Sequence, residues 1–291
     1  MLVTTGIKAQ FYIAPNGSDN NPGTKEKPLA SLTGARNAIR KNKNTLPKNK
    51  SIIVTVLEGS YTMEEPLILN SIDGGTKSNP VIYKAQKGAS PVFSGGKQIN
   101  GFKVNKNDIW EVQIPNIKNQ QWKIDQLYVN GNRAVLARTP NKGFLKIDQI
   151  NENVLVEGTG RAPKRATQTI LFDTEDFSFA KNIADNEIKN VRFRTFHHWD
   201  FTLRFLDSID NNQMAIYTTG QGMKPWNPIK KGGRIMFENF KAALDKAGEW
   251  FLNDEGILYY IPLPGQTPEN TVIIAPVLEN LISFNGDAKS V

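Results

Sequence analysis

Residues 51–69 read SIIVTVLEGSYTMEEPLIL, and this stretch decides the class of fold. Its first seven residues form an apolar, β-branched run, which is typical of a strand buried on both faces. A turn follows at 58–61, and 66–69 predicts a second strand. Two more short strands are predicted at 80–85 and 91–95. Because Gly, Asn or Pro turns separate these strands and no helix lies between them, alternating β-α-β units are excluded, and a sandwich, a barrel or a stacked β-solenoid remains.

The residues before this stretch predict a strand, a loop and one helix. A short strand is predicted at 11–15, followed at 16–24 by a loop rich in Asn, Asp and Gly. The loop lacks the twelfth-position Glu of an EF-hand, so we interpret it as a turn held by its own side chains. No motif supports a structural calcium ion, and we predict no cofactor. A short amphipathic helix is predicted over 32–40, with Ser31 or Thr33 as its N-cap.

A different pattern begins near residue 122. Residues 125–134 alternate between apolar and polar side chains around an Asn-Gly pair, which predicts a β-hairpin. Residues 191–196 alternate in the same way, and strict alternation is typical of antiparallel sheets with one buried face and one wet face. A second hairpin is predicted over 249–261, and short strands of the parallel type are predicted again over 271–284.

Several of these segments resemble one known group of proteins. FYIAPNGSDNNPGTKEKPLASLTGARNAIR (11–40), together with 51–69, resembles the N-terminal signature of secreted, pectate-lyase-like right-handed parallel β-helix proteins. Three later segments are similar to the insert found in β-helical glycoside hydrolases of the β-xylosidase, α-fucosidase and α-galactosidase kinds: QLYVNGNRAVLARTPN (126–141), GEWFLNDEGILYYIPLPG (248–265) and VIIAPVLENLISFNG (272–286). The resemblance spans nearly the whole chain.

The resemblance implies an all-β chain with a definite domain order. Residues 11–115 would form the N-terminal cap and first rungs of a parallel β-helix, 116–268 an inserted antiparallel sandwich or barrel, and 269–291 a return to the helix. Residues 1–10 are interpreted as the remnant of a signal peptide or as an ordinary strand. The parent protein is expected to be secreted, periplasmic or on the cell surface. No second cap is predicted after 269–291, so the chain is interpreted as truncated.

Composition excludes several classes of function. The chain has no Cys and only two His, which excludes disulfides, thiol catalysis and Cys-ligated zinc and argues against a His-rich metal site. The net charge is +8, but the Lys residues are dispersed, and the densest basic stretch, 36–50, lacks interleaved aromatic residues. We therefore predict no nucleic-acid partner. No segment is apolar over the length that a membrane helix needs, and the oligomeric state is not predicted.

Residues 196–201 (FHHWDF) are the most unusual constellation for a binding site. The only two His of the chain, His197 and His198, stand beside Trp199 and Asp200. A Trp ring can stack on a sugar face, and an Asp–His pair can bind hydroxyls or move a proton. Along a strand, His197 and Trp199 would face away from His198 and Asp200, so a shared pocket requires a turn. The alternative is a strand end whose Trp packs in the core.

Two further residues are candidates for substrate contact. Arg138 precedes a Thr-Pro pair that can aim its guanidinium, either at substrate or into a structural ion pair. Trp226 lies in a loop rich in Gly and Pro, where an exposed ring can serve as a sugar platform. The acidic residues at 173–176 and at 64–65 are interpreted as loop or solvated groups.

The sequence supports three functions. The first is the N-terminal portion of a glycoside hydrolase acting on an oligo- or polysaccharide. In the resembling enzymes the catalytic carboxylates lie on later rungs, so we predict them beyond residue 291 and identify no catalytic residue in this chain. The second is a polysaccharide lyase acting on uronic acids, which the positive net charge would suit. The third is a non-catalytic adhesion or binding protein.

Overall fold

The computed structural model describes residues 10–46, 50–115, 124–160 and 162–286. These residues form two compact units: unit 2 is Gln98–Ala275, and the segments before and after it form unit 1. The predicted domains 11–115, 116–268 and 269–291 remain a prediction. The expected signal-peptide remnant falls almost wholly on residues 1–9, which lie outside the described residues, as do 116–123 and 287–291.

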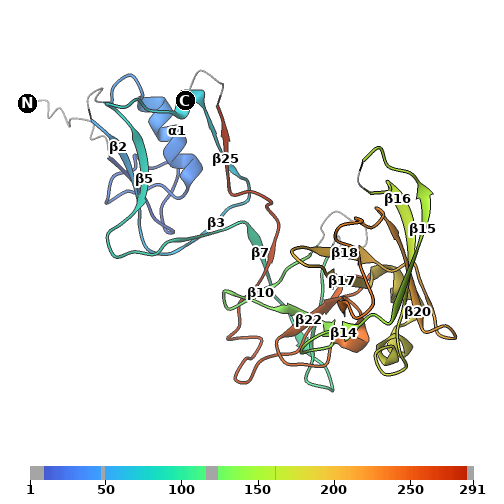
Figure 1. Ribbon diagram of the computed structural model, residues 1–291. Helices are drawn as coiled ribbons and strands as arrows, with labels where there is room; N and C mark the ends of the chain where they lie inside the picture. The colour runs from blue at the N-terminus through green and yellow to red at the C-terminus, as the bar shows by residue number, and fades with distance from the viewer. Residues whose placement is uncertain (1–9, 47–49, 116–123, 161, 287–291) are drawn as a thin grey trace, which may run out of the picture. The chain divides into compact units, whose positions relative to one another are not determined.

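Unit 1 contains three short parallel sheets and one α-helix (Figure 1). The sheets have the orders β1-β2-β5, β3-β6 and β4-β25, and neighbouring strands in each of them run parallel. The bounds are β1 Gln10–Ile13, α1 Leu32–Asn42, β2 Ile52–Val56, β3 Ser60–Thr62, β4 Leu67–Asn70, a 3-10 turn Ser71–Asp73, β5 Val81–Ala85, β6 Val92–Ser94 and β25 Ile282–Asn285.

The core of unit 1 lies between α1 and these strands. Leu32, Ala35 and Ile39 form the buried face of α1 and belong to one apolar cluster with Ile13 and Val54. Of the two predicted N-caps, Ser31 and Thr33, the structure selects Ser31, whose Oγ accepts the Gly34 N–H at 2.8 Å. The loop before the helix is closed by its own groups, because Asp19 accepts from the N–H groups of Ala30 and Ser31.

Unit 2 is built from three larger sheets that are almost entirely antiparallel (Figure 1). Their orders are β12-β22-β23-β9-β8, β13-β21-β17-β18 with β14 beside β21, and β15-β16-β20-β19, and a fourth sheet has the order β11-β10-β24-β7. The bounds are β7 Gly96–Ile99, β8 Lys103–Val104, β9 Trp110–Gln113, β10 Tyr128–Val129, β11 Asn132–Arg133, β12 Val135–Leu136, β13 Arg138–Thr139, β14 Leu145–Lys146, β15 Gln149–Val156, β16 Arg165–Leu171, β17 Arg192–Phe196, β18 Phe201–Phe205, β19 Ser208–Asp210, β20 Ala215–Gly220, β21 Arg234–Glu238, β22 Glu249–Leu252, β23 Ile257–Tyr260 and β24 Ile273–Pro276, with 3-10 turns at Ser178–Asn182, Asp185–Asn190 and Lys241–Ala243.

Two apolar clusters hold unit 2 together. The larger one is aromatic, and Phe179 and Phe237 stack in it with their ring centroids 4.1 Å apart. The smaller one surrounds Trp250, Tyr260 and Leu127, all nearly fully buried. Every second side chain of the alternating strands points away from these clusters. These side chains form the surface of the sheets that faces away from the core.

The expected right-handed parallel β-helix is wrong. Among the described residues, parallel pairing is confined to the short sheets of unit 1 and to β12 with β22, and the larger sheets of unit 2 are antiparallel. These sheets do not close into a parallel helix, so the pectate-lyase-like resemblance is wrong as a description of the fold. The coarser expectation of a mostly β chain is confirmed. Short strands between Gly and Asn turns suit both architectures, and strand direction is decided by pairing between distant segments.

The predicted hairpins form where turn chemistry is strong. Asn130 and Gly131 have φ of 48° and 76°, as the tight turn between β10 and β11 requires, and β22 pairs with β23 as predicted. The long hairpin β15–β16 lacks such a two-residue turn. No helix of the described residues is long and apolar enough to cross a membrane.

Candidate functional site

The candidate site lies on the sheet β13-β21-β17-β18 of unit 2. Strand β17 reads Arg-Phe-Arg-Thr-Phe, and its Phe193 and Thr195 are buried toward the core. Alternation therefore turns Arg192, Arg194 and Phe196 to the opposite side of the sheet. Polar and aromatic groups thus share a surface that the core does not use.

The neighbouring strands extend this surface. Strands β21 and β18 both pair with β17. The residues directly opposite Arg192, Arg194 and Phe196 on these two strands therefore lie on the same side of the sheet as those three residues. We call this surface the outer face, and it comprises Arg192, Arg194 and Phe196 of β17, Arg234, Met236 and Glu238 of β21, and Phe201, Leu203 and Phe205 of β18. The three β18 side chains are exposed.

A groove of about 380 Å³ crosses one part of the outer face. It is lined by Asp125, Gln126, Arg133, Ala134, Val135, Leu136, Arg138, Phe144, Arg192, Arg194, Phe196, Met236, Glu238 and Trp250. Arg138, a candidate from the sequence, therefore lies in the groove. The sequence patterns did not identify Arg192, Arg194 or Glu238 as site residues. The alternation of 192–196 nevertheless placed the two arginines on one face of the strand.

Ion pairs order the floor of the groove. Glu238 accepts from Arg194 Nε at 3.0 Å and lies 3.3 Å from Arg192 Nε. Arg192 Nη1 also lies 3.5 Å from Asp125 Oδ1. Glu238 and Arg192 are both largely buried, so these charges are fixed in place.

Arg138 is held differently from the other two arginines. Its Nε donates to the Pro140 carbonyl at 3.1 Å and its Nη2 to the Gly143 carbonyl at 3.3 Å. It forms no ion pair with any carboxylate of the described residues. The ion-pair alternative is therefore wrong for these residues, and the guanidinium is positioned by neutral groups.

Two buried donors of the groove lining have no hydrogen-bond partner among the described residues. They are Trp250 Nε1 and Arg192 Nε. Arg192 Nε lies close to the Glu238 carboxylate, but the two groups are not in hydrogen-bond geometry. Buried N–H groups in native proteins are almost always satisfied, so these two donors set the groove lining apart from an ordinary packed core.

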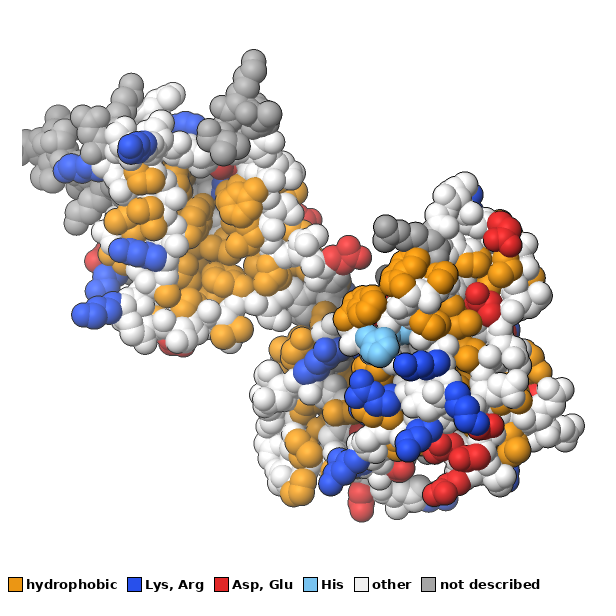
Figure 2. Space-filling view, in the orientation of Figure 1, with side chains coloured by type: hydrophobic (Ala, Val, Ile, Leu, Met, Phe, Trp, Pro, Cys, Tyr) orange, Lys and Arg blue, Asp and Glu red, His pale blue; other side chains and the backbone are white. Residues whose placement is uncertain are grey.

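Aromatic rings and cations continue the outer face beyond the groove. The Arg234 guanidinium lies 5.1 Å from the Phe144 ring centroid and 5.6 Å from that of Phe196. Arg194 lies 5.5 Å from the Phe201 ring centroid. In Figure 2, a His side chain on unit 2 is surrounded by hydrophobic and cationic side chains on the visible face.

The FHHWDF segment forms the turn between β17 and β18. The His197 N–H donates to the Asp200 carbonyl at 2.9 Å, which closes the hairpin, and His197 Nε2 lies 2.9 Å from Thr202 Oγ1. The turn removes the strand constraint that would have separated these side chains. Trp199 is 67% exposed, so the alternative in which its ring packs in the core is wrong.

A second loop is tied to this turn. Asp200 accepts from Lys224 Nζ at 2.9 Å and from Asn227 Nδ2 at 2.7 Å, and the His198 N–H donates to Asn227 Oδ1 at 3.2 Å. Lys224 holds the pKa of Asp200 below its usual range by hydrogen bonding and charge. Trp226, in the same loop, is 44% exposed. The structure thus brings the 197–200 segment and the Trp226 loop together.

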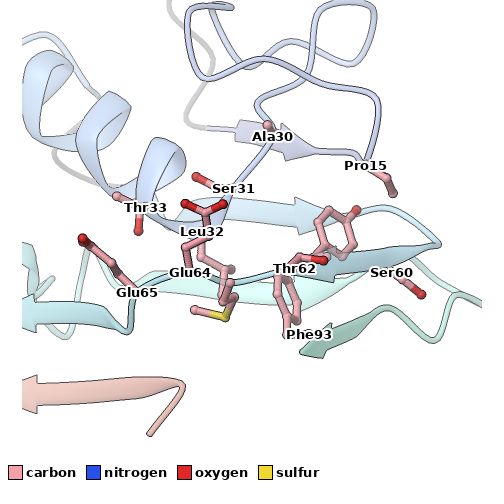
Figure 3. Close-up of a pocket in the computed structure, with 12 residues that line it drawn as sticks. Pro15, Ala30, Ser31, Leu32, Thr33, Ser60, Thr62, Glu64, Glu65 and Phe93 are labelled. Atoms are coloured by element: carbon pink, nitrogen blue, oxygen red, sulfur yellow. The ribbon is translucent and has the colours of Figure 1, made fainter. Parts of the chain in front are cut away.

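The other acidic candidates have structural surroundings. Asp173 caps the following turn by accepting the Asp176 N–H at 2.8 Å, and Asp176 accepts the Lys146 N–H at 2.9 Å. Glu64 and Glu65 are exposed and line an open groove of about 540 Å³ in unit 1, and Figure 3 shows their carboxyls directed apart from each other. These two carboxyls alone do not define a site.

Glu249 is a titratable group that sequence reasoning missed. It is 2% exposed, and burial raises the pKa of its carboxyl to about 7. The carboxyl accepts hydrogen bonds from the N–H groups of Asp245 and Lys246, which lower the pKa but do not offset the effect of burial. It precedes Trp250 on β22 but does not line the groove. In the described ranges, no group of three or more His, Asp or Glu is placed to hold a metal ion.

Comparisons with known proteins show what this fold is similar to. No protein-family model and no curated protein matches the sequence. A solved structure described as "Glycoside hydrolase" is similar over 96% of this chain, at 23% identity and a TM-score of 0.76. The chain spans 47% of that structure's length. A second solved structure, "The complex structure of XylC with xylose", is 13% identical over 94% of this chain and 32% of its own length. Its TM-score is 0.36, so no argument is based on it.

Proposed function

We propose that this chain belongs to a carbohydrate-active protein of the glycoside hydrolase kind and contributes a saccharide-binding surface to it. The observation that carries the proposal is the outer face itself. It combines exposed aromatic rings with ordered arginine and carboxylate groups, and it leads to the turn that exposes Trp199.

The chemistry of such a surface suits a sugar ring. A pyranose has an apolar face of C–H groups and an edge of hydroxyls. Indole and phenyl rings cover apolar surface at little cost in conformational entropy, and fixed charged groups bind hydroxyls through strong hydrogen bonds. Trp199, Trp226 and Phe201 provide exposed rings. Asp200 and Lys224 provide polar groups held beside two of them.

The likeness to a structure described as "Glycoside hydrolase" supports the carbohydrate theme. Binding is proposed for this chain, with cleavage assigned to the whole protein. Hydrolysis needs two carboxyl groups flanking the scissile bond, and both carboxylates of the groove, Asp125 and Glu238, are paired with Arg192. A secreted, periplasmic or cell-surface location is part of the proposal.

A glycan array followed by isothermal titration calorimetry of the full chain tests the proposal. Trp199→Ala is expected to weaken binding of the selected saccharide about tenfold, which corresponds to roughly 1.4 kcal/mol. Phe284→Ala is the matched control, because Phe284 is an exposed aromatic residue of unit 1 and lies outside the outer face. If no saccharide binds, or if both variants bind as the unchanged chain does, the proposed function is wrong.

A further inference from the structure

We propose that the groove of unit 2 binds the anionic group, a carboxylate or a sulfate, of an acidic saccharide. This inference rests on the proposed function and names the class of sugar that the same face would select.

The charge of the groove is the first step. Four arginines line it, Arg133, Arg138, Arg192 and Arg194, against two carboxylates, so two positive charges remain in excess. Both carboxylates are paired with Arg192, and one also binds Arg194. Arg133 and Arg138 have no carboxylate partner within the described residues. The uncompensated charge therefore belongs to these two side chains.

The geometry of Arg138 is the second step. Its guanidinium is fixed by the carbonyls of Pro140 and Gly143, which engage Nε and Nη2. The Nη1 group donates to no described residue. A positioned guanidinium with free donors suits the planar, paired oxygens of a carboxylate or the oxygens of a sulfate. Because neutral carbonyls hold it, ligand binding breaks no ion pair.

The remaining lining suits the rest of a sugar ring. Phe144 and Phe196 line the groove, and the Arg234 guanidinium lies 5.1 Å and 5.6 Å from their ring centroids. Trp250 lines the groove, and its buried Nε1 has no acceptor among the described residues. The excess of arginines distinguishes this groove from the turn at Trp199, where Asp200 and Lys224 balance each other.

The test compares charged saccharides with neutral partners of the same shape. Calorimetry with the full chain would use trigalacturonate against its methyl ester, and a sulfated galactan oligosaccharide against its desulfated form. We expect at least one charged ligand to bind about tenfold or more tightly than its partner. The preference should shrink between about 10 mM and about 100 mM NaCl, as the screening length falls from about 30 Å to about 10 Å. The pair that shows the preference identifies the anion.

Two variants locate the site. Arg138→Met is expected to remove the preference for the charged ligand, with circular dichroism confirming the fold. Lys231→Met, which removes one exposed charge paired with Asp148 outside the groove, should leave it unchanged. If Arg138→Met does not fold, the comparison of charged and neutral ligands on the unchanged chain decides.

Equal affinities for charged and neutral partners, or a preference that survives Arg138→Met, would overturn the anion site. Saccharide binding itself would still stand if the neutral ligands bind and Trp199→Ala weakens them. If none of the four ligands binds, the anion site is overturned as well, and the glycan array decides the proposed function separately.

Discussion

Glu249 makes the stability of unit 2 depend on pH in an unusual direction. Its carboxyl is 2% exposed, and its pKa rises from 4.5 to about 7, chiefly by desolvation. Between these values the folded chain holds a proton that the unfolded chain has released. The contribution of Glu249 to the free energy of unfolding is therefore fully present below about pH 4.5 and is lost as the pH rises through about 7. With about 1.4 kcal/mol per pKa unit, the loss is on the order of 3 kcal/mol.

The variant Glu249→Gln tests this reasoning. The amide keeps an oxygen that can accept the N–H groups of Asp245 and Lys246, and it removes the buried charge. We expect the variant to match the unchanged chain near pH 5 and to exceed it near pH 8 by up to about 3 kcal/mol. Urea unfolding at several pH values, followed by fluorescence and near-ultraviolet circular dichroism, gives the difference.

The control for this experiment is Glu255→Gln, which removes the same charge from an exposed position. Its difference from the unchanged chain should be small at every pH, because exposed groups contribute little. A Glu249→Gln variant that is destabilised equally at pH 5 and pH 8 would refute the argument. That result would mean that the carboxylate is ionised in the fold and stabilised by its N–H donors.

Three further predictions concern unit 1, each checked by urea unfolding. Asp73→Asn removes the carboxylate charge and one of the two 2.6 Å bonds from Arg40, because the amide keeps a single oxygen that can accept. Arg40 lowers the pKa of Asp73, so we expect a loss of about 1–3 kcal/mol near pH 7 that disappears in acid, where wild-type Asp73 is protonated too. Ser31→Ala removes the N-cap of α1 and should cost about 1 kcal/mol, whereas Ser31→Asn should cost less. Tyr61→Phe removes the bond to the Leu57 carbonyl and should cost about 1 kcal/mol; an unchanged midpoint would contradict this.

Local features of the fold were predictable from sequence because their causes are local. The N-cap at Ser31 and the turn at Asn130-Gly131 depend on side chains within a few residues, and both occur as predicted. The same holds for the alternation of 191–196, which correctly assigned one buried and one open face. The mostly β character follows from many such signals.

Long-range pairing was not predictable in the same way. The parallel β-helix was inferred from a resemblance, and the sheets of the described residues do not form one. The pair β13–β21 joins Arg138 to Glu238 across a hundred residues of sequence, and no local pattern marks that partner. Strand order is set by which distant apolar faces can be buried together, and many arrangements satisfy one alternating pattern.

The candidate site was also predictable only in its local features. The sequence by itself determined which residue types were present: the rare His-His-Trp-Asp turn, Arg138 beside its Thr-Pro pair, and Trp226 in its loop. Only the tertiary structure decided that the turn exposes Trp199, that Asn227 joins the two loops, and that Arg138 keeps an unpaired charge. A side chain's type is local, whereas its exposure, its partners and the balance of charge around it depend on segments that folding brings together from distant parts of the chain.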